Sequence, residues 1–118
     1  MSKPIKIEFT ERPGILSAYR KILFTRRKGF KQGQEFPDIH GEWLNATIDK
    51  DLLQKYNRVC ELESTDVIPV LFPHVMASPA YMAILAHKEF PLFLMGALHL
   101  RNHIIQHRPV KIDETFDI

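Results

Sequence analysis

The sequence has little cysteine and no excess of charge of one sign. Cys60 is the one cysteine in 118 residues, which excludes an internal disulfide framework and a cysteine-based zinc site. A reducing compartment fits best, and we expect a cytoplasmic protein. The formal net charge of +2 is too small to indicate a nucleic-acid partner. Charged residues also occupy the N-terminus where a signal peptide would have its apolar core, so no export signal is predicted.

The length and composition indicate one globular domain over residues 1–118. A chain of 118 residues can bury a single core. Apolar residues make up 45% and charged residues 25%, which is ordinary for a folded domain. The sequence contains no internal repeat, low-complexity segment or interdomain linker.

One stretch is long enough to cross a bilayer. Residues 67–86 carry no charge at neutral pH, and about 20 apolar residues span a membrane. However, Pro69, Pro73 and Pro79 fall within it, and each removes a backbone donor that lipid cannot replace. We therefore predict a buried helix here and no membrane partner.

The first half of the chain shows four local patterns. Ile5, Ile7 and Phe9 alternate with polar residues, which predicts a strand. A helix is predicted over residues 15–23 and a strand over residues 41–47. Asp49 is a suitable N-cap for a helix over residues 50–60. The side chains expected to face inward are Ile15, Ala18, Tyr19 and Ile22 in the first helix, and Leu52, Leu53, Tyr56, Val59 and Cys60 in the second.

The second half is dominated by one apolar helix and one long strand. Ser78 followed by Pro79 is typical of a helix start, so a helix is predicted over residues 79–88, and its lack of a polar face indicates that protein surrounds it. Residues 98–108 give the strongest strand pattern, which Pro109 should interrupt. Residues 111–118 begin a further strand, with Ile112, Glu114, Phe116 and Ile118 on one side.

These two segments, residues 72–85 and 96–110, together resemble the centre of a MaoC-like hotdog acyl-thioester dehydratase/hydratase domain. The likeness covers roughly residues 49–118 and is greatest to the non-catalytic, N-terminal hotdog half of double-hotdog dehydratases. It implies an α+β hotdog fold, in which a curved antiparallel sheet surrounds a central helix. Such a domain normally continues for further strands, so we expect this one to lack its last strands. We expect it to be truncated, or completed by a homodimer or a catalytic hotdog partner.

The family's hydratase motif resembles Gly-Asp-x-Asn-Pro-x-His, and this chain matches it only in part. Asp66 and Pro69 fall in register, but Leu71 occupies the histidine position and Ile68 the asparagine position. Leucine cannot transfer a proton, so we expect a domain that is pseudo-catalytic on its own and supports a catalytic half. If the chain is active, Asp66 and a displaced base, His74, are the acid/base residues of an enoyl-CoA hydratase-like hydro-lyase. A structural role for His74 at the helix entrance is the favoured interpretation.

The same resemblance implies an acyl-CoA ligand or substrate and no other cofactor. Met76, Tyr81, Met82 and Leu85 are expected to form the wall of an acyl tunnel. Arg101 and His103 lie on the basic face of the long predicted strand, either near the thioester's phosphates or on a solvated outer surface. His99 and His103 would be about 13 Å apart along a strand, too far to share one ion, so no metal site is predicted.

Two alternatives stay open. The chain can be a non-enzymatic acyl-binding or oligomerisation module, and a thioesterase is a weaker enzymatic alternative. A basic cluster of Arg26, Arg27, Lys28 and Lys31 has no aromatic platform beyond Phe30, so a solvated loop is favoured over nucleic-acid binding.

Overall fold

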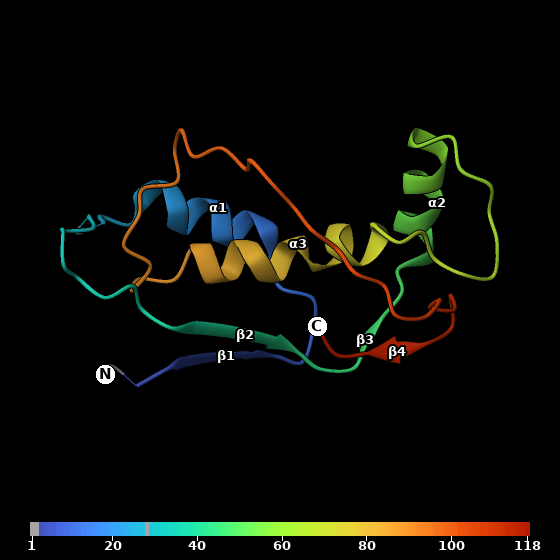
Figure 1. The fold of residues 1–118 in the computed structure, drawn as a ribbon, viewed down its shortest axis with the longest axis horizontal. Helices are drawn as coiled ribbons and strands as arrows, with labels where there is room; N and C mark the ends of the chain where they lie inside the picture. The colour runs from blue at the N-terminus through green and yellow to red at the C-terminus, as the bar shows by residue number, and fades with distance from the viewer. Residues whose placement is uncertain (1–2, 28) are drawn as a thin grey trace.

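The computed structural model describes residues 3–27 and 29–118; Lys28, one member of the predicted basic cluster, lies outside the described residues. The fold is α+β, with three helices and two small sheets (Figure 1). In chain order the elements are β1 (Ile5–Phe9), α1 (Ile15–Phe24), β2 (Ile39–Trp43), β3 (Ala46–Thr47), α2 (Lys50–Val59), α3 (Phe72–Leu85) and β4 (Thr115–Phe116).

Helix α3 lies between a two-stranded sheet and α1. Strands β1 and β2 pair in parallel, in a register from Ile5 with Ile39 to Phe9 with Trp43. Helix α3 packs on β2, and α1 packs on α3 (Figure 1). A Cβ atom at Gly41 would lie 2.7 Å from Cδ1 of Ile84, so any larger residue at this position would require the Ile84 side chain to move.

The predicted first strand and first helix are both confirmed. Strand β1 shows the expected alternation of burial. Ala18 and Ile22 are buried on α1, and together with Ala86 they form a small cluster against which Met82 and Leu94 pack. Tyr19 was predicted to face inward, and this is wrong because its side chain is exposed.

The strand predicted over residues 41–47 is two strands separated by a turn. Strand β2 ends at Trp43, and Asn45 has a left-handed φ of 53°, which asparagine tolerates better than most residues. The Asn45 N–H donates to Oδ1 of Asp117 at 2.8 Å. This turn directs β3 toward β4, with Ala46 opposite Phe116 in an antiparallel pair.

The N-cap predicted for α2 is confirmed, but the inward face of the helix is shorter than expected. The Leu52 N–H donates to Oδ1 of Asp49 at 2.9 Å, and Leu53 is buried. Val59 is 82% exposed and Cys60 is also exposed, so both were wrongly placed in the core. Helix α2 stands at one end of the molecule (Figure 1), and its last turn extends past the residues that could cover it.

Helix α3 begins seven residues earlier than predicted. Its first turn contains Pro73, while Pro79 lies inside the helix and is fully buried. Ser78 is therefore not an N-cap. Pro73 and Pro79 both suit the first turn of a helix, and the prediction placed the start at Pro79 because Ser78 precedes it as a possible N-cap. No helix of the described residues is long and apolar enough to span a membrane.

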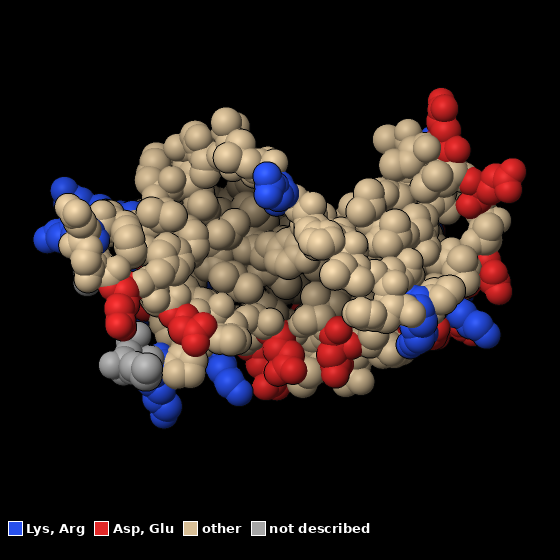
Figure 2. Space-filling view, in the orientation of Figure 1, with Lys and Arg blue, Asp and Glu red and all other residues tan. Residues whose placement is uncertain are grey.

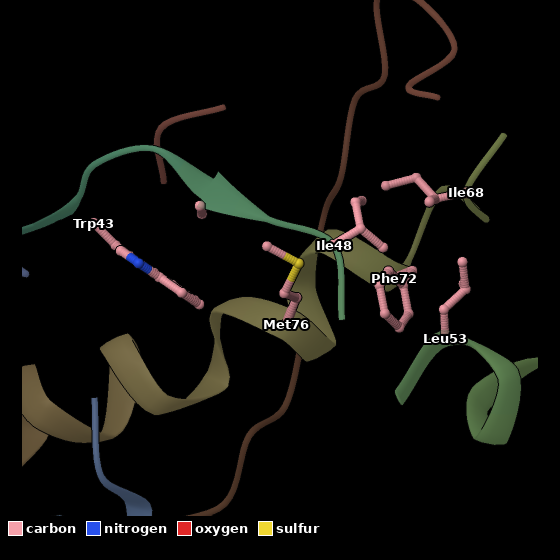
Figure 3. Packing of buried hydrophobic residues seen from close by; sticks show 7 residues of the cluster. Trp43, Ile48, Leu53, Ile68, Phe72 and Met76 are labelled. Carbon is pink, nitrogen blue, oxygen red and sulfur yellow. The ribbon is translucent and has the colours of Figure 1, made fainter. Parts of the chain in front are cut away.

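The main core lies where α3, α2 and the β2–β3 region meet. Phe72 is completely buried and contacts the Tyr56 ring edge-on, with ring centroids 5.5 Å apart. Figure 3 shows Met76 between Trp43 and Ile48 in this cluster. The buried members are Trp43, Ala46, Ile48, Leu53, Ile68, Phe72 and Met76.

The long strand predicted over residues 98–108 does not form. This segment is extended along α3 (Figure 1), but the described residues offer it no hydrogen-bonded neighbouring strand. Beyond it the predicted alternation is confirmed, since Ile112, Glu114, Phe116 and Ile118 are each more buried than the residues between them. Regular pairing is limited to β4 and a bridge between Val67 and Lys111. The structure thus confirms the α+β class, and the hotdog sheet stays a prediction.

An exposed ion pair closes the loop that leads into β4. Nη1 and Nη2 of Arg108 donate to the two carboxylate oxygens of Glu114 at 3.0 and 2.7 Å, and the Lys111 N–H donates at 2.9 Å. The hydrogen bonds from Arg108, then the backbone bond from Lys111, lower the pKa of Glu114 from 4.5 to about 2.

The lowered pKa predicts how this loop responds to acid. A carboxyl group whose folded pKa is below its unfolded pKa stabilises the fold above pH 4.5, and this stabilisation is lost as the pH falls toward about 2. An NMR titration of the Glu114 carboxyl carbon should therefore give a midpoint near 2, which Arg108→Gln should raise toward 4.5. An unchanged midpoint in Arg108→Gln would contradict the pairing.

Candidate functional site

The site lies between α3, residues 102–104 and the C-terminal residues 116–118. These three segments enclose an open pocket of about 370 Å³. Its lining residues are Pro73, His74, Ala77, Tyr81, Asn102, His103, Ile104, Phe116, Asp117 and Ile118. Sequence reasoning proposed three of these, His74, Tyr81 and His103, as functional residues.

Aromatic and imidazole rings form one wall of this pocket. His74 and Tyr81 are seven residues apart on α3, a spacing that puts them on one helix face, and their ring centroids are 5.2 Å apart. The His99 ring, from the extended segment, lies 6.0 Å from the His74 ring. Nε2 of His99 also contacts the Arg101 carbonyl oxygen at 2.9 Å, which holds that ring against its own segment.

The structure does not bring the proposed acid/base pair to one pocket. Asp66 is exposed and is not one of the residues that line the pocket of His74. Its backbone carbonyl accepts from the Ile112 N–H at 3.0 Å. This hydrogen bond joins the segment before α3 to the segment before β4.

The carboxylate that lines this pocket belongs to Asp117, a residue that sequence reasoning missed. Asp117 holds the Asn45 turn through Oδ1, and no motif surrounds it in the sequence. One indication of Asp117 was present in the sequence, the alternation predicted for residues 111–118. That alternation puts Asp117 on the more exposed side of the segment.

The other proposed acyl-binding residues lie outside the pocket. Met76 is a buried core residue (Figure 3). Met82 packs against the smaller cluster, Leu85 is half-buried, and Arg101 is exposed. Of the six residues proposed to bind an acyl thioester, Tyr81 and His103 line this pocket. The alternation of a strand was the basis for pairing Arg101 with His103, and that strand is absent.

The basic cluster is only partly a solvated loop. Arg27 is half-buried, and its guanidinium donates to the carbonyl oxygens of Leu85 at 3.1 Å and Phe90 at 2.8 Å, as well as to that of His87. The Leu85 carbonyl belongs to the last turn of α3 and the other two lie just beyond it, where helical partners run out. Arg27 thus stabilises the end of the helix that carries His74 and Tyr81, whereas Arg26 is exposed.

The pocket contains polar groups of several kinds beside apolar side chains. It offers imidazole, phenol, amide and carboxylate groups, and the carboxylate of Asp117 already accepts from the Asn45 N–H through Oδ1. Such a lining can bind an apolar chain that ends in a polar group. Within residues 3–27 and 29–118 there is no group of three histidine, cysteine or acidic residues placed to hold a metal ion.

Comparison with known proteins gives one informative match. The chain is 30% identical over 71 residues to the 3-hydroxyacyl-thioester dehydratase X of Mycobacterium tuberculosis. The match covers 60% of this chain but 25% of that protein, so the chain spans about a quarter of its relative's length. No family model and no solved structure matches the chain. Over this stretch, the chain is similar to a dehydratase of 3-hydroxyacyl thioesters.

Proposed function

We propose that this chain is a MaoC-like hotdog domain that binds an acyl thioester, such as acyl-CoA, and supports a catalytic half or partner without catalysing the reaction itself. The observation that carries the proposal is the similarity to an acyl-thioester dehydratase. The pocket that holds three of the residues singled out from the sequence gives such a ligand a place to bind. No cofactor other than the acyl-CoA ligand belongs to the proposal.

The pocket's chemistry suits the acyl end of a thioester. Ala77, Ile104 and Phe116 offer apolar contacts for the chain. His103 and Tyr81 can donate hydrogen bonds to the thioester carbonyl oxygen, which is a weak acceptor that gains from an apolar, partly enclosed setting. Such a pocket binds by complementary contacts and needs no proton transfer.

The proposed lack of catalysis follows from three positions. Hydration of an enoyl thioester needs a carboxylate and an imidazole within hydrogen-bond reach of one water. Leu71 stands where the family motif has its histidine. Asp66 does not line the pocket that contains His74. Asp117 does line it, but its carboxylate accepts from the Asn45 N–H through Oδ1 and holds that turn. We therefore propose that a second domain or chain supplies the acid/base pair.

Binding of octanoyl-CoA, measured by isothermal titration calorimetry, tests the site. Tyr81→Ala and His103→Ala are each expected to weaken binding about tenfold, since each removes one polar contact worth about 1–1.5 kcal/mol. The matched controls are Tyr19→Ala and His107→Ala, which change exposed residues outside the pocket and should leave binding unchanged. Equal affinities in all four variants would place the ligand elsewhere.

A partner surface supports the second candidate, an oligomerisation module. Leu98 and Leu100 are 81% and 89% exposed, and Ile105 is also exposed. They lie on the extended segment that crosses α3 (Figure 1). Figure 2 shows that the middle of this face is mostly uncharged, with one basic side chain in its upper part and the other charges along the lower edge and at the ends. The radius of gyration, 16.4 Å, exceeds the roughly 13–14 Å of a compact domain of this length. These features favour a homodimer or a hotdog partner that covers this face. We also propose a cytoplasmic location, which rests on the low cysteine content of the sequence.

A further inference from the structure

A second cavity lies between β1, α1 and the C-terminal end of α3. Its volume is about 560 Å³, within the roughly 300–1,000 Å³ of small-molecule sites. None of its lining residues lines the pocket of the proposed function. Its apolar lining consists of Ile7, Phe9, Pro13, Ala18, Ala83 and Ala86.

The charged residues of this cavity are all basic. Lys21 of α1 and Lys88 beyond α3 both line it, beside the imidazole of His87. Because a lysine keeps its ammonium in water while its stem covers apolar surface, the two ammonium groups belong at the cavity's opening. Neither lysine forms an ion pair within the described parts of the chain. No carboxylate is among the described lining residues.

The backbone adds to this positive potential. Gly14 begins α1 without a side-chain cap, and the first turn contains no acidic residue. Gly14 and Ser17 both line the cavity, so the unpaired N–H groups of the first turn lie at its edge. The N-terminus of α1 makes a minor contribution to the positive potential of the cavity, and the two lysines make the larger one.

We propose that this cavity binds a free fatty acid of medium length. Its carboxylate is held between the ammonium groups of Lys21 and Lys88, and its chain lies against the apolar lining. The inference is independent of acyl-thioester binding at α3, because the two sites share no residue. A neutral apolar ligand would leave the two lysines without a counter-charge.

Calorimetric titration of decanoate into the 118-residue chain tests this site. We expect saturable binding with one decanoate per chain. Lys21→Met and Lys88→Met keep an apolar stem and remove the charge, so each should weaken binding about threefold to tenfold, as expected for a partly exposed charge-assisted contact. Added salt should weaken binding to the unaltered chain and have little effect on the double variant.

Three controls make the result decisive. Lys55→Met, an exposed lysine on α2, and Tyr81→Ala in the other pocket should both bind decanoate normally, and 1-decanol should bind more weakly than decanoate. The proposal would be overturned if the lysine variants lower the melting temperature but leave decanoate binding intact. The lysines would then stabilise the ends of α1 and α3 without binding the ligand. Loss of binding in Tyr81→Ala, or the absence of saturable binding, would also overturn it.

Discussion

Phe72→Ala is expected to lower the free energy of unfolding by about 3–5 kcal/mol. Phe72 is 0% exposed at the start of α3, where it joins α2 and the β2–β3 region in the main core. Truncation removes its apolar burial and its edge-on contact with Tyr56. It also leaves a cavity that the neighbouring elements fill only partly, and a domain of this size has few other large buried rings to compensate.

Urea denaturation followed by circular dichroism measures this effect. Phe93→Ala is the matched control, because Phe93 is 61% exposed and its truncation should cost about 0.5 kcal/mol or less. Equal midpoints for the two variants would contradict the assignment of the core to the start of α3. The same result would remove the support for the earlier helix start, since the predicted helix over residues 79–88 excludes Phe72.

Arg27→Met is expected to destabilise the chain by about 2–3 kcal/mol, because three partly buried carbonyl groups lose a charged donor at once. The guanidinium joins the carbonyls of Leu85, His87 and Phe90, and methionine retains most of the apolar stem. The effect should be local as well as global, with faster amide exchange in the last turn of α3. Hydrogen exchange followed by NMR resolves that turn from the rest of the helix.

Arg26→Met is the control for this prediction. Arg26 is adjacent and exposed, so its replacement removes the same charge without removing a carbonyl contact. If both variants lose the same stability, the net charge of the loop matters and the contacts of Arg27 do not.

Local sequence rules predicted the elements whose residues contact near neighbours in the chain. The Asp49 cap depends on a bond to a residue three positions later, and the alternation of β1 depends on the geometry of a single strand. The same rules misplaced the start of α3, because Pro73 and Pro79 satisfy the same preference. Burial of Pro79 among neighbouring elements decided between them, and burial is a property of the whole fold.

Part of the candidate site could also be predicted from local spacing, and part could not. His74 and Tyr81 share a face because of helical spacing, which a sequence shows directly. Asp117 enters the pocket through long-range contacts, including its bond to the Asn45 turn, and no local pattern could have indicated it. Arg101 was assigned from the alternation of a strand that finds no partner among the described residues. Its proposed role therefore lost its geometric basis.

The similarity to a dehydratase and the geometry of the pocket bear on different questions. The first is a likeness, over 71 residues, to a protein that acts on 3-hydroxyacyl thioesters. The second leaves the carboxylate of Asp66 outside the pocket of His74. A domain that binds the acyl group and leaves proton transfer to a partner is consistent with both.

Hydration of octenoyl-CoA by the purified chain, with Asp66→Ala and His74→Ala alongside, tests this account most directly. We expect no turnover in any of the three proteins, while the unaltered chain, folded by circular dichroism, still binds octanoyl-CoA. Turnover in the unaltered chain that is lost in both variants would contradict the account, because it would show that Asp66 and His74 act together on one substrate.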